Sequence, residues 1–366
     1  MGISHYFYPM YPDFQYLLQG LFGVSMPAWL SIFKTFGFFV ALAFIAAAKA
    51  TTSELKRKED QGLLEPVIKD TVVKEKAADG TEVKVTKKVK TYPHQLITEI
   101  VFAAAIGGII GAKLFSFFED WDSFVKDPVG NIFSRSGLTF YGGFIVATIV
   151  LYYYTRKYKI NFRHMCDAAA PAIMLAYGIG RLGCQFAGDG DWGIYNTAYV
   201  TEARGDLRLA TSADTSYVKS MIGTTPGTSF QAPGGVPRWL VAMNYPHNVG
   251  YEGRPIEGCT GEYCNVLPVA VFPTPIYEAI AGILLFGLMW AVRKKLKYPL
   301  HMFGLYLVLA AVERFFVELI RVNSKYDFGF VKPSQAELIS VILFISGMCL
   351  LLFYKPEQPI KAAGAV

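Results

Sequence analysis

The residues best suited to chemistry lie between Gly178 and Gly193, where a hydrophobic segment gives way to a long polar loop. This stretch, GIGRLGCQFAGDGDWG, places Arg181, Asp189 and Asp191 among repeated glycines. Glycine lets backbone N–H groups approach a ligand closely, and an arginine forms paired hydrogen bonds to phosphate or carboxylate. Charge beside a bilayer is costly and marks a functional site, so we expect an anion such as a phospholipid head group here. The structural alternative is a helix end where Arg181 only pairs with Asp189 or Asp191.

A second charged group occurs in the sequence AAVERFFVELIR near position 315. Arg314, Glu318 and Arg321 are spaced i, i+4 and i+7, which predicts one face of a helix. We expect Glu318 to hold the arginines while an anionic ligand takes their remaining donors. The alternative is an interfacial salt bridge with snorkelling arginines. Because Arg181 belongs to a separate segment, the two groups together favour an anion-binding cavity.

Two further segments begin with candidate substrate-binding residues. Tyr141 precedes the glycine pair Gly142 and Gly143, which allows close approach by a helix or a lipid chain. In the other segment Pro275 suits a first helical turn, which places Glu278 near the edge of the membrane.

Long apolar segments must position these residues. The chain has 366 residues, 53% of them hydrophobic, and its mean hydropathy is +0.32. Several segments reach the roughly 17–25 residues needed to cross a bilayer. We therefore expect an all-α polytopic membrane protein with about seven transmembrane helices and an irregular extracytoplasmic head between the fourth and the fifth. The expected spans are residues 28–48, 95–117, 138–155, 164–182, 273–292, 300–320 and 335–354.

Basic residues predict the orientation of the chain. Lys and Arg follow the third, fifth and seventh segments, and ten more occur between Lys56 and Lys90. The positive-inside rule then places the amino terminus outside and the carboxyl terminus in the cytoplasm. The net charge of +6 therefore reflects topology, and we expect no nucleic-acid partner. The first 29 residues lack a basic region before an apolar one, so no cleaved signal peptide is expected.

Three parts follow along the chain: residues 1–183 with four spans, a head at 184–271, and residues 272–366 with three spans and a cytoplasmic tail. Residues 51–93 form a charged cytoplasmic insert within the first part. Alternating Val and Thr there favour a β-hairpin turning at Asp79–Gly80, and a flexible loop is the alternative.

The head contains most of the unusual chemistry. Its Gly, Pro, Thr and Ser content favours irregular loops and short strands. Cys259 and Cys264 lie in this external region with Thr-Gly-Glu-Tyr between them, which predicts a local disulfide. Cys166, Cys184 and Cys349 fall in or beside apolar segments, where cysteine is usually a small apolar residue.

These motifs, in this order, resemble those of the phosphatidylglycerol–prolipoprotein diacylglyceryl transferases of bacteria. The resemblance rests on residues 180–193, 141–143, 272–278 and 314–321. The chain departs from the family pattern at a few positions. Cys184 replaces an asparagine, Tyr141 a histidine, Phe272 and Pro275 a histidine and a glutamine, and Ala310 a tyrosine.

The resemblance implies a reaction in the bacterial inner membrane. The diacylglyceryl group of phosphatidylglycerol moves to the lipobox cysteine thiol of a prolipoprotein signal peptide, which forms a thioether and releases glycerol phosphate. Arg181, Arg314 and Arg321 would hold the phosphate, with membrane lipids around them. No metal or organic cofactor is expected.

A thiol with a pKa near 8.5 is mostly protonated at neutral pH, so the reaction needs a base or a positive field. Tyr141, Asp189, Asp191 and His247 are the candidate bases, and we expect Tyr141 to orient substrate and His247 to take the proton. A catalytically silent homologue that binds lipid or partner proteins is the alternative function. A transporter is disfavoured because no inverted repeat is visible.

Overall fold

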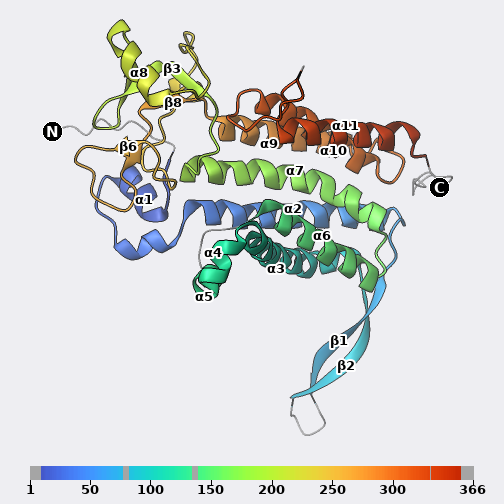
Figure 1. The fold of residues 1–366 in the computed structure, drawn as a ribbon. Helices are drawn as coiled ribbons and strands as arrows, with labels where there is room; N and C mark the ends of the chain where they lie inside the picture. Colours follow the sequence, from blue (N-terminus) through green and yellow to red (C-terminus); the bar gives the residue numbers. More distant parts are fainter. Residues whose placement is uncertain (1–9, 77–81, 134–138, 330, 356–366) are drawn as a thin grey trace. The chain divides into compact units, whose positions relative to one another are not determined.

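The computed structural model describes residues 10–76, 82–133, 139–329 and 331–355 (Figure 1). The chain divides into two compact units. The first comprises residues 1–46, 173–293 and 304–353, and the second comprises residues 47–172, 294–303 and 354–366.

Long helices dominate the described residues. Four of them, α2, α3, α9 and α11, are long and apolar enough to cross a membrane by length and composition. The helices α7, α9 and α10 carry most of the charged residues considered below. The helices of 18 or more residues are α2 (Thr35–Asp60), α3 (Pro93–Glu119), α6 (Phe140–Lys157), α7 (Phe162–Ala187), α9 (Thr274–Val292), α10 (His301–Glu318) and α11 (Gln335–Phe353).

The first expected span is displaced along the chain. Residues 28–32 form the short 3-10 helix η1 (Ala28–Ile32), and α2 begins only at Thr35, whose hydroxyl donates to the Tyr11 carbonyl at 2.5 Å. The helix then continues to Asp60, so the charged insert begins about ten residues later than expected. Contacts between Arg57 and Glu54, one turn apart, pair opposite charges along this polar extension.

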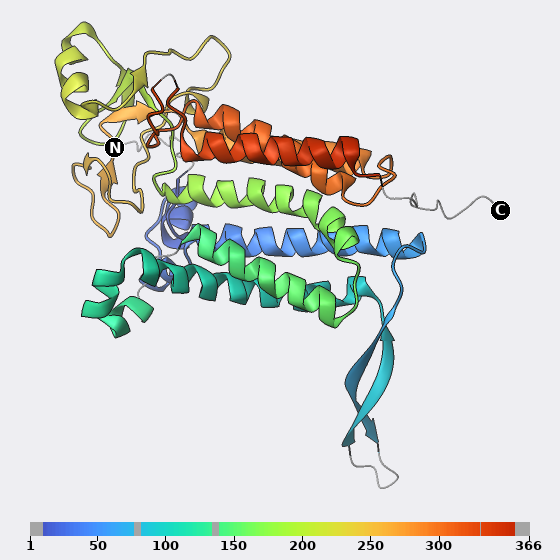
Figure 2. The ribbon, with the colours of Figure 1, turned by 45° about the vertical axis from the view of Figure 1, so that its right-hand side comes forward.

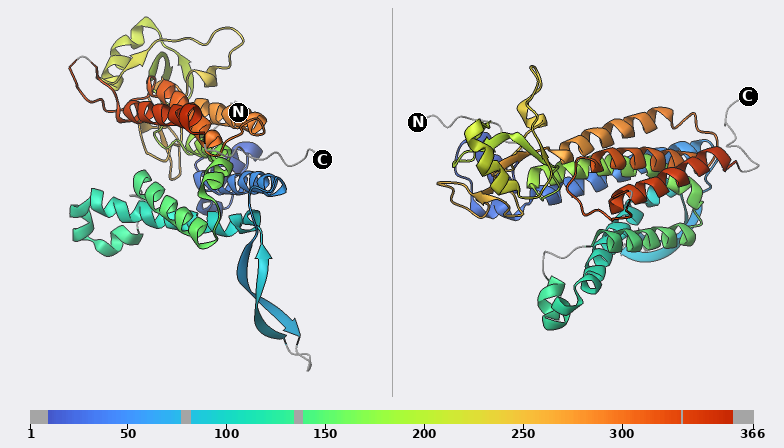
Figure 3. Two further views of the ribbon diagram at one scale, coloured as in Figure 1. Left: turned by 90° about the vertical axis from the view of Figure 1, so that its right-hand side faces the viewer. Right: turned by 45° about the horizontal axis from the view of Figure 1, so that its top comes forward.

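Small sheets correct the all-α expectation. In the second unit β1 (Val67–Lys76) pairs antiparallel with β2 (Glu82–Thr91), in register from Val67 opposite Thr91 to Lys76 opposite Glu82. The hairpin is therefore confirmed, and its expected turn at Asp79–Gly80 lies outside the described residues. Figure 3 shows the hairpin projecting from the helices of this unit.

Glycines bring α3 and α6 of the second unit into close contact. A Cβ atom on Gly107 would lie 2.8 Å from the Val150 side chain, and one on Gly111 would lie 2.5 Å from the Gly142 carbonyl oxygen. A larger residue at either position would push the helices apart.

In the first unit, α9, α10 and α11 run alongside the second half of α7 (Figure 2). Gly178 of α7 faces Gly282 of α9, where an added Cβ would lie 2.9 Å from the Gly178 Cα atom. Gly304 of α10 similarly faces Gly347 of α11. These close crossings fix the register between the helices that carry the charged residues.

The head of the first unit contains a four-stranded sheet. Its strands β3 and β8 lie at the centre of a small apolar core with Val200, Val218 and Val269. The Cys259–Cys264 disulfide is present, which confirms the expectation from sequence. The elements are β3 (Tyr195–Thr201), β4 (Leu207–Leu209), β5 (Gly227–Thr228) and β8 (Val269–Val271), the pair β6 (Arg254–Pro255) and β7 (Asn265–Val266), and α8 (Thr215–Ile222).

Shorter helices complete the chain. Asp13 caps α1 (Phe14–Phe22) by accepting the Tyr16 N–H at 3.1 Å. In the second unit α4 (Trp121–Lys126) and α5 (Pro128–Phe133) follow α3.

Candidate active site

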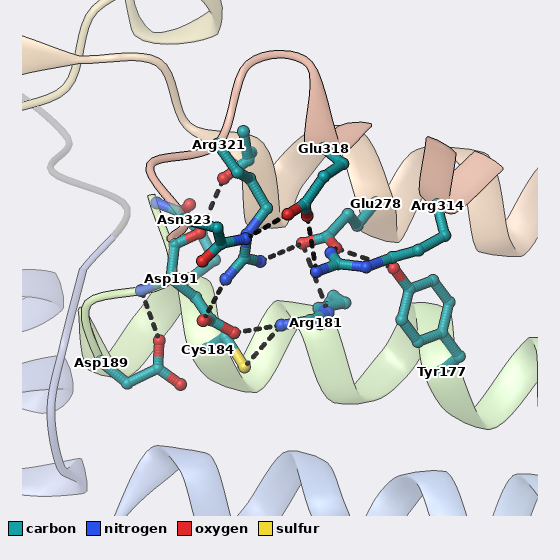
Figure 4. Close-up of polar contacts among 12 residues, drawn as sticks. Tyr177, Arg181, Cys184, Asp189, Asp191, Glu278, Arg314, Glu318, Arg321 and Asn323 are labelled. Carbon is teal, nitrogen blue, oxygen red and sulfur yellow. Dashed lines mark hydrogen bonds and ion pairs between the residues drawn. The ribbon is translucent and has the colours of Figure 1, made fainter. Parts of the chain in front are cut away.

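Three arginines converge on one buried carboxylate, Glu278 of α9 (Figure 4). Arg181 Nε lies 3.3 Å from Glu278 Oε2, and Arg314 Nη1 lies 3.3 Å from Oε1. Arg321 Nη1 lies 3.6 Å from Oε2. The Glu278 side chain is 0% exposed, so this carboxylate depends on the arginines for its stabilisation.

Two more carboxylates complete the cluster. Asp191 bridges Arg181 and Arg321, with its Oδ1 2.6 Å from Arg321 Nη2. Glu318 Oε2 lies 2.8 Å from Arg314 Nη2, and its other oxygen accepts from Asn323 at 2.6 Å. Three arginines thus face three carboxylates within this cluster.

Asp191 is the accessible member of the cluster. Its side chain is 34% exposed, whereas those of Glu278 and Glu318 are 0% and 2% exposed. Burial alone would raise the pKa of Asp191, but Arg181 and Arg321 outweigh burial and lower that pKa. Arg181 does pair with an aspartate, Asp191, but it also faces Glu278, so this ion pair is one part of a larger cluster.

The start of α9 positions Glu278. The helix begins at Thr274 with Pro275 in its first turn, as the sequence predicted. Proline presets the backbone angle for a helix start and needs no N–H partner there. The Thr274 hydroxyl donates to the Asp191 carbonyl at 2.7 Å, which ties this helix end to the loop after α7.

Arg321 reaches the cluster from outside a helix, which corrects the expectation of a continuous helical face. The helix α10 ends at Glu318, and the following chain forms a bridge with the loop after α7. Ile194 N donates to the Ile320 carbonyl at 2.8 Å. A Cβ atom on Gly193 would lie 2.7 Å from the same carbonyl oxygen, so this close approach requires glycine.

Tyr177 and Glu313 also belong to the site, although neither was among the residues expected from the motifs. The Tyr177 hydroxyl lies 2.9 Å from Glu278 Oε1 and 3.1 Å from Glu313 Oε1. Arg181 packs over the Tyr177 ring, 5.3 Å from its centroid. Two signals point to these residues: Tyr177 is one turn before Arg181, and an acid such as Glu313 within an apolar helix marks a functional site.

Asp189 lies beside the cluster rather than within it. Its side chain is exposed, its carboxylate is 3.4 Å from the Asp191 backbone N–H, and partial desolvation by the neighbouring chain raises its pKa. Cys184 lies nearby, with Sγ 3.8 Å from Arg181 Nη1. Donor atoms of these two residues and Asp191 lie within 4.8 Å of one another, but the arginines bound to Asp191 oppose a cation there.

His247 contacts a different part of the head. Its Nδ1 is 2.6 Å from the Tyr263 carbonyl oxygen, and its ring lies 5.1 Å from that of Tyr16. The Cys259 sulfur is 4.0 Å away. Burial lowers the His247 pKa, so the imidazole is neutral near pH 7. These contacts join His247 to α1 and the disulfide loop.

Tyr141, Gly142 and Gly143 belong to the second unit, at the start of α6. Tyr141 is 47% exposed. A Cβ atom on Gly142 would collide with Phe115, and one on Gly143 would lie 3.0 Å from the Gly108 carbonyl oxygen. Helix packing therefore explains the two glycines, and their role in binding substrate stays a prediction.

Apolar helices together with a buried cluster of arginines and carboxylates define the class of protein, a multi-pass membrane protein with a charged site at the ends of its helices. The sequence profile of one family, prolipoprotein diacylglyceryl transferase, matches residues 80–353. The chain belongs to this family, and it is a transferase.

Similar proteins come from several bacteria, and each is named phosphatidylglycerol–prolipoprotein diacylglyceryl transferase. The protein of Chlorobaculum tepidum is 29% identical over 280 residues, which cover 73% of this chain and 75% of that protein. That of Leptospira interrogans is 25% identical over 305 residues, covering 70% and 78%. That of Dehalococcoides mccartyi is 29% identical over 266 residues, covering 71% and 79%.

Proposed function

We propose that this chain transfers the diacylglyceryl group of phosphatidylglycerol to the lipobox cysteine of prolipoproteins, with the chemistry at the arginine cluster. The carbon–oxygen bond between the diacylglyceryl group and the phosphate breaks, and a carbon–sulfur bond forms. The thiol loses its proton, and glycerol phosphate leaves with the electron pair of the broken bond. Family membership and the names of the relatives support this reaction.

The observation that carries the proposal is the convergence of Arg181, Arg314 and Arg321 on Glu278. A leaving phosphate ester gains negative charge as its bond breaks, and preorganised donors stabilise that charge most. Three guanidiniums held by a buried carboxylate are preorganised in this sense, because their positions do not depend on the substrate.

Phosphate must compete with the resident carboxylates, since each arginine already has acidic partners. Asp191 is the exposed partner, and it lies on a loop that follows α7. We infer that the phosphate enters beside Asp191 and takes donors of Arg181 and Arg321. Glu318, which pairs with Arg314, keeps this arginine in place.

Among the candidate bases we favour Asp189, whose carboxylate is exposed beside the cluster. Its raised pKa makes it a better proton acceptor than Asp191, which two arginines hold in the ionised form. His247 faces Tyr263 and Tyr16, and this argues for a structural role. We assign to Tyr141 the orientation of substrate.

The seven long helices support a seven-span topology in the bacterial inner membrane. We place the head outside and the β1–β2 hairpin in the cytoplasm. Lys and Arg are concentrated in the insert that contains the hairpin and in the segments that follow α6 and α9, and such segments face the cytoplasm. Phosphatidylglycerol then reaches the site from the outer leaflet.

A transfer assay tests the reaction. Purified protein is mixed with phosphatidylglycerol carrying labelled acyl chains and with a lipobox peptide. We expect label on the peptide, and none when the lipobox cysteine is serine. In addition, expression of this protein should rescue a bacterium that has been depleted of its own transferase. A protein that binds the lipid but transfers nothing would instead be a silent lipid-binding homologue.

A further inference from the structure

The contacts of Tyr177 require one proton more than is present when Tyr177 is neutral and Glu278 and Glu313 are both ionised. Its hydroxyl oxygen lies within hydrogen-bond distance of both Glu278 and Glu313. A hydroxyl has one proton to donate, and an ionised carboxylate can only accept. Two hydrogen bonds among these three groups therefore need a second proton, carried by one of the carboxyl groups.

Glu313 is the carboxyl group that carries it. Both oxygens of Glu278 already face guanidinium groups, which are donors that need an acceptor. Glu313 is buried, and Tyr177 is the hydrogen-bond partner that the structure gives it. The chain of donors thus runs from the Glu313 carboxyl group to the Tyr177 oxygen, and from the Tyr177 hydroxyl to Glu278.

Charged and titratable groups surround these hydrogen bonds on each helix that contributes to them. Glu278 faces Glu313 from α9, while Tyr177 and Arg181 face it from α7. Arg314 and Tyr306 act on it from α10 itself.

We propose that Glu313, Tyr177 and Glu278 form a proton relay that discharges Glu278 when an anionic phosphate enters the arginine cluster. Glu313 gives its proton to the Tyr177 oxygen as Tyr177 gives its own proton to Glu278. Atoms and charge balance, because one proton has moved from one carboxyl group to another. The inference rests on the proposed function and adds two positioning residues to it.

The relay resolves the competition between phosphate and carboxylate. At rest three arginines face Asp191, Glu278 and Glu318, and a bound phosphate would add a fourth anion. Moving the proton to Glu278 removes one negative charge from direct contact with the arginines. The guanidinium donors that held Glu278 then become available to the phosphate.

Infrared spectroscopy of the full-length protein tests the resting state without any lipid. At neutral pH the difference spectrum between wild type and Glu313→Gln should contain the carbonyl stretch of a protonated carboxylic acid. Glu337→Gln is the matched control, because Glu337 accepts the Ser334 N–H at the start of α11 and glutamine can do the same. A Glu313→Gln difference spectrum without that band would overturn the proposal.

Calorimetry tests the proton transfer itself. Phosphatidylglycerol in mixed micelles is titrated into protein in two buffers of different ionisation enthalpy, which counts the protons taken up. Wild type and Glu337→Gln should take up none, because the proton is supplied internally. Glu313→Gln and Tyr177→Phe should take up about one proton per lipid, and their affinity should fall roughly tenfold per pH unit.

The outcomes separate the relay from the proposed function. If wild type binds no phosphatidylglycerol, the lipid assignment fails while the infrared result still decides the state of Glu313. If wild type binds it and both variants bind without proton uptake, the relay is wrong. Tyr177→Phe keeps the ring beneath Arg181, so it tests the hydroxyl without removing the packing.

Discussion

At the scale of single residues, the site depends on Glu278, because the carboxylate of this one residue pairs with three guanidiniums. Removing one partner of a buried ion pair costs about 3–5 kcal/mol, since the remaining charge loses its compensation. Each arginine has a second carboxylate partner, Asp191 or Glu318. The cluster therefore responds to substitution as a unit.

Arg181→Ala should reduce transfer by about two to four orders of magnitude while the protein stays in the membrane. Two charge-assisted hydrogen bonds to phosphate are worth about 1.5–3 kcal/mol each. The transfer assay measures the loss, and membrane extraction with size-exclusion chromatography controls for folding. Near-normal transfer by this variant would exclude Arg181 from the phosphate site.

Arg314 and Glu318 should behave as coupled neighbours. Each single substitution, Arg314→Ala or Glu318→Ala, should cause nearly the loss of the double variant, with a coupling free energy of about 0.5–3 kcal/mol. The double-mutant cycle is measured on kcat/KM for transfer. Fully additive losses would mean that the two residues have separate roles.

The two candidate bases, Asp189 and His247, lead to opposite expectations for the pH dependence of transfer and for the variants. If Asp189 takes the thiol proton, the rate rises with pH as Asp189 ionises, and its raised pKa moves this rise above the range of an ordinary aspartate. Asp189→Asn should recover activity only near pH about 8.5, where the thiol ionises unaided. His247→Gln and Tyr141→Phe should keep measurable transfer. An inactive His247→Gln beside an active Asp189→Asn would reverse the assignment.

At the scale of elements, the close crossing of α7 and α9 sets the distance between Arg181 and Glu278. The crossing occurs at Gly178 and Gly282, one turn from each of the charged residues. Small residues allow such contact between membrane helices.

Gly282→Val should lower the midpoint of thermal unfolding and abolish most transfer. An added Cβ at Gly282 would lie 2.9 Å from the Gly178 Cα atom, and overpacking of this kind costs about 1–3 kcal/mol. Gly287→Ala on the same helix is the control, since nothing lies within 4 Å of its added Cβ. Equal behaviour of the two variants would show that the crossing does not position the site.

At the scale of the whole molecule, the orientation of the chain determines which leaflet supplies the lipid. Ser220 of α8 and Glu65 before β1 are both exposed, and the proposed topology places them on opposite sides of the membrane. They are suitable positions for a labelling test.

Ser220→Cys should react with a membrane-impermeant thiol reagent in intact spheroplasts, and Glu65→Cys should react only after the membrane is opened. The test is made with Cys166 and Cys349 replaced by serine, because both are free thiols with exposed surface, whereas the third free thiol, Cys184, is buried and is kept. The reverse labelling pattern would place the head in the cytoplasm, and the outer-leaflet route for the lipid would then be wrong.

The sequence by itself determined the local features of this protein. Apolar segments located the long helices to within a few residues for six of the seven, because the length and hydropathy of a helix are properties of a contiguous stretch. The motif spacings identified Arg181, Arg314 and Glu318, and the short loop between Cys259 and Cys264 predicted their disulfide. Proline at the start of α9 correctly predicted that helix end.

Only the tertiary structure decided which charges meet. Arg321 joins the cluster through pairing of the chain after α10 with the loop after α7, a contact between segments more than a hundred residues apart. Glu278 lies at the centre because α9 crosses α7 at Gly178, and Tyr177 and Glu313 meet through the same packing. Spacing along the chain cannot encode such contacts, since the energy of a buried charge depends on partners that distant segments supply.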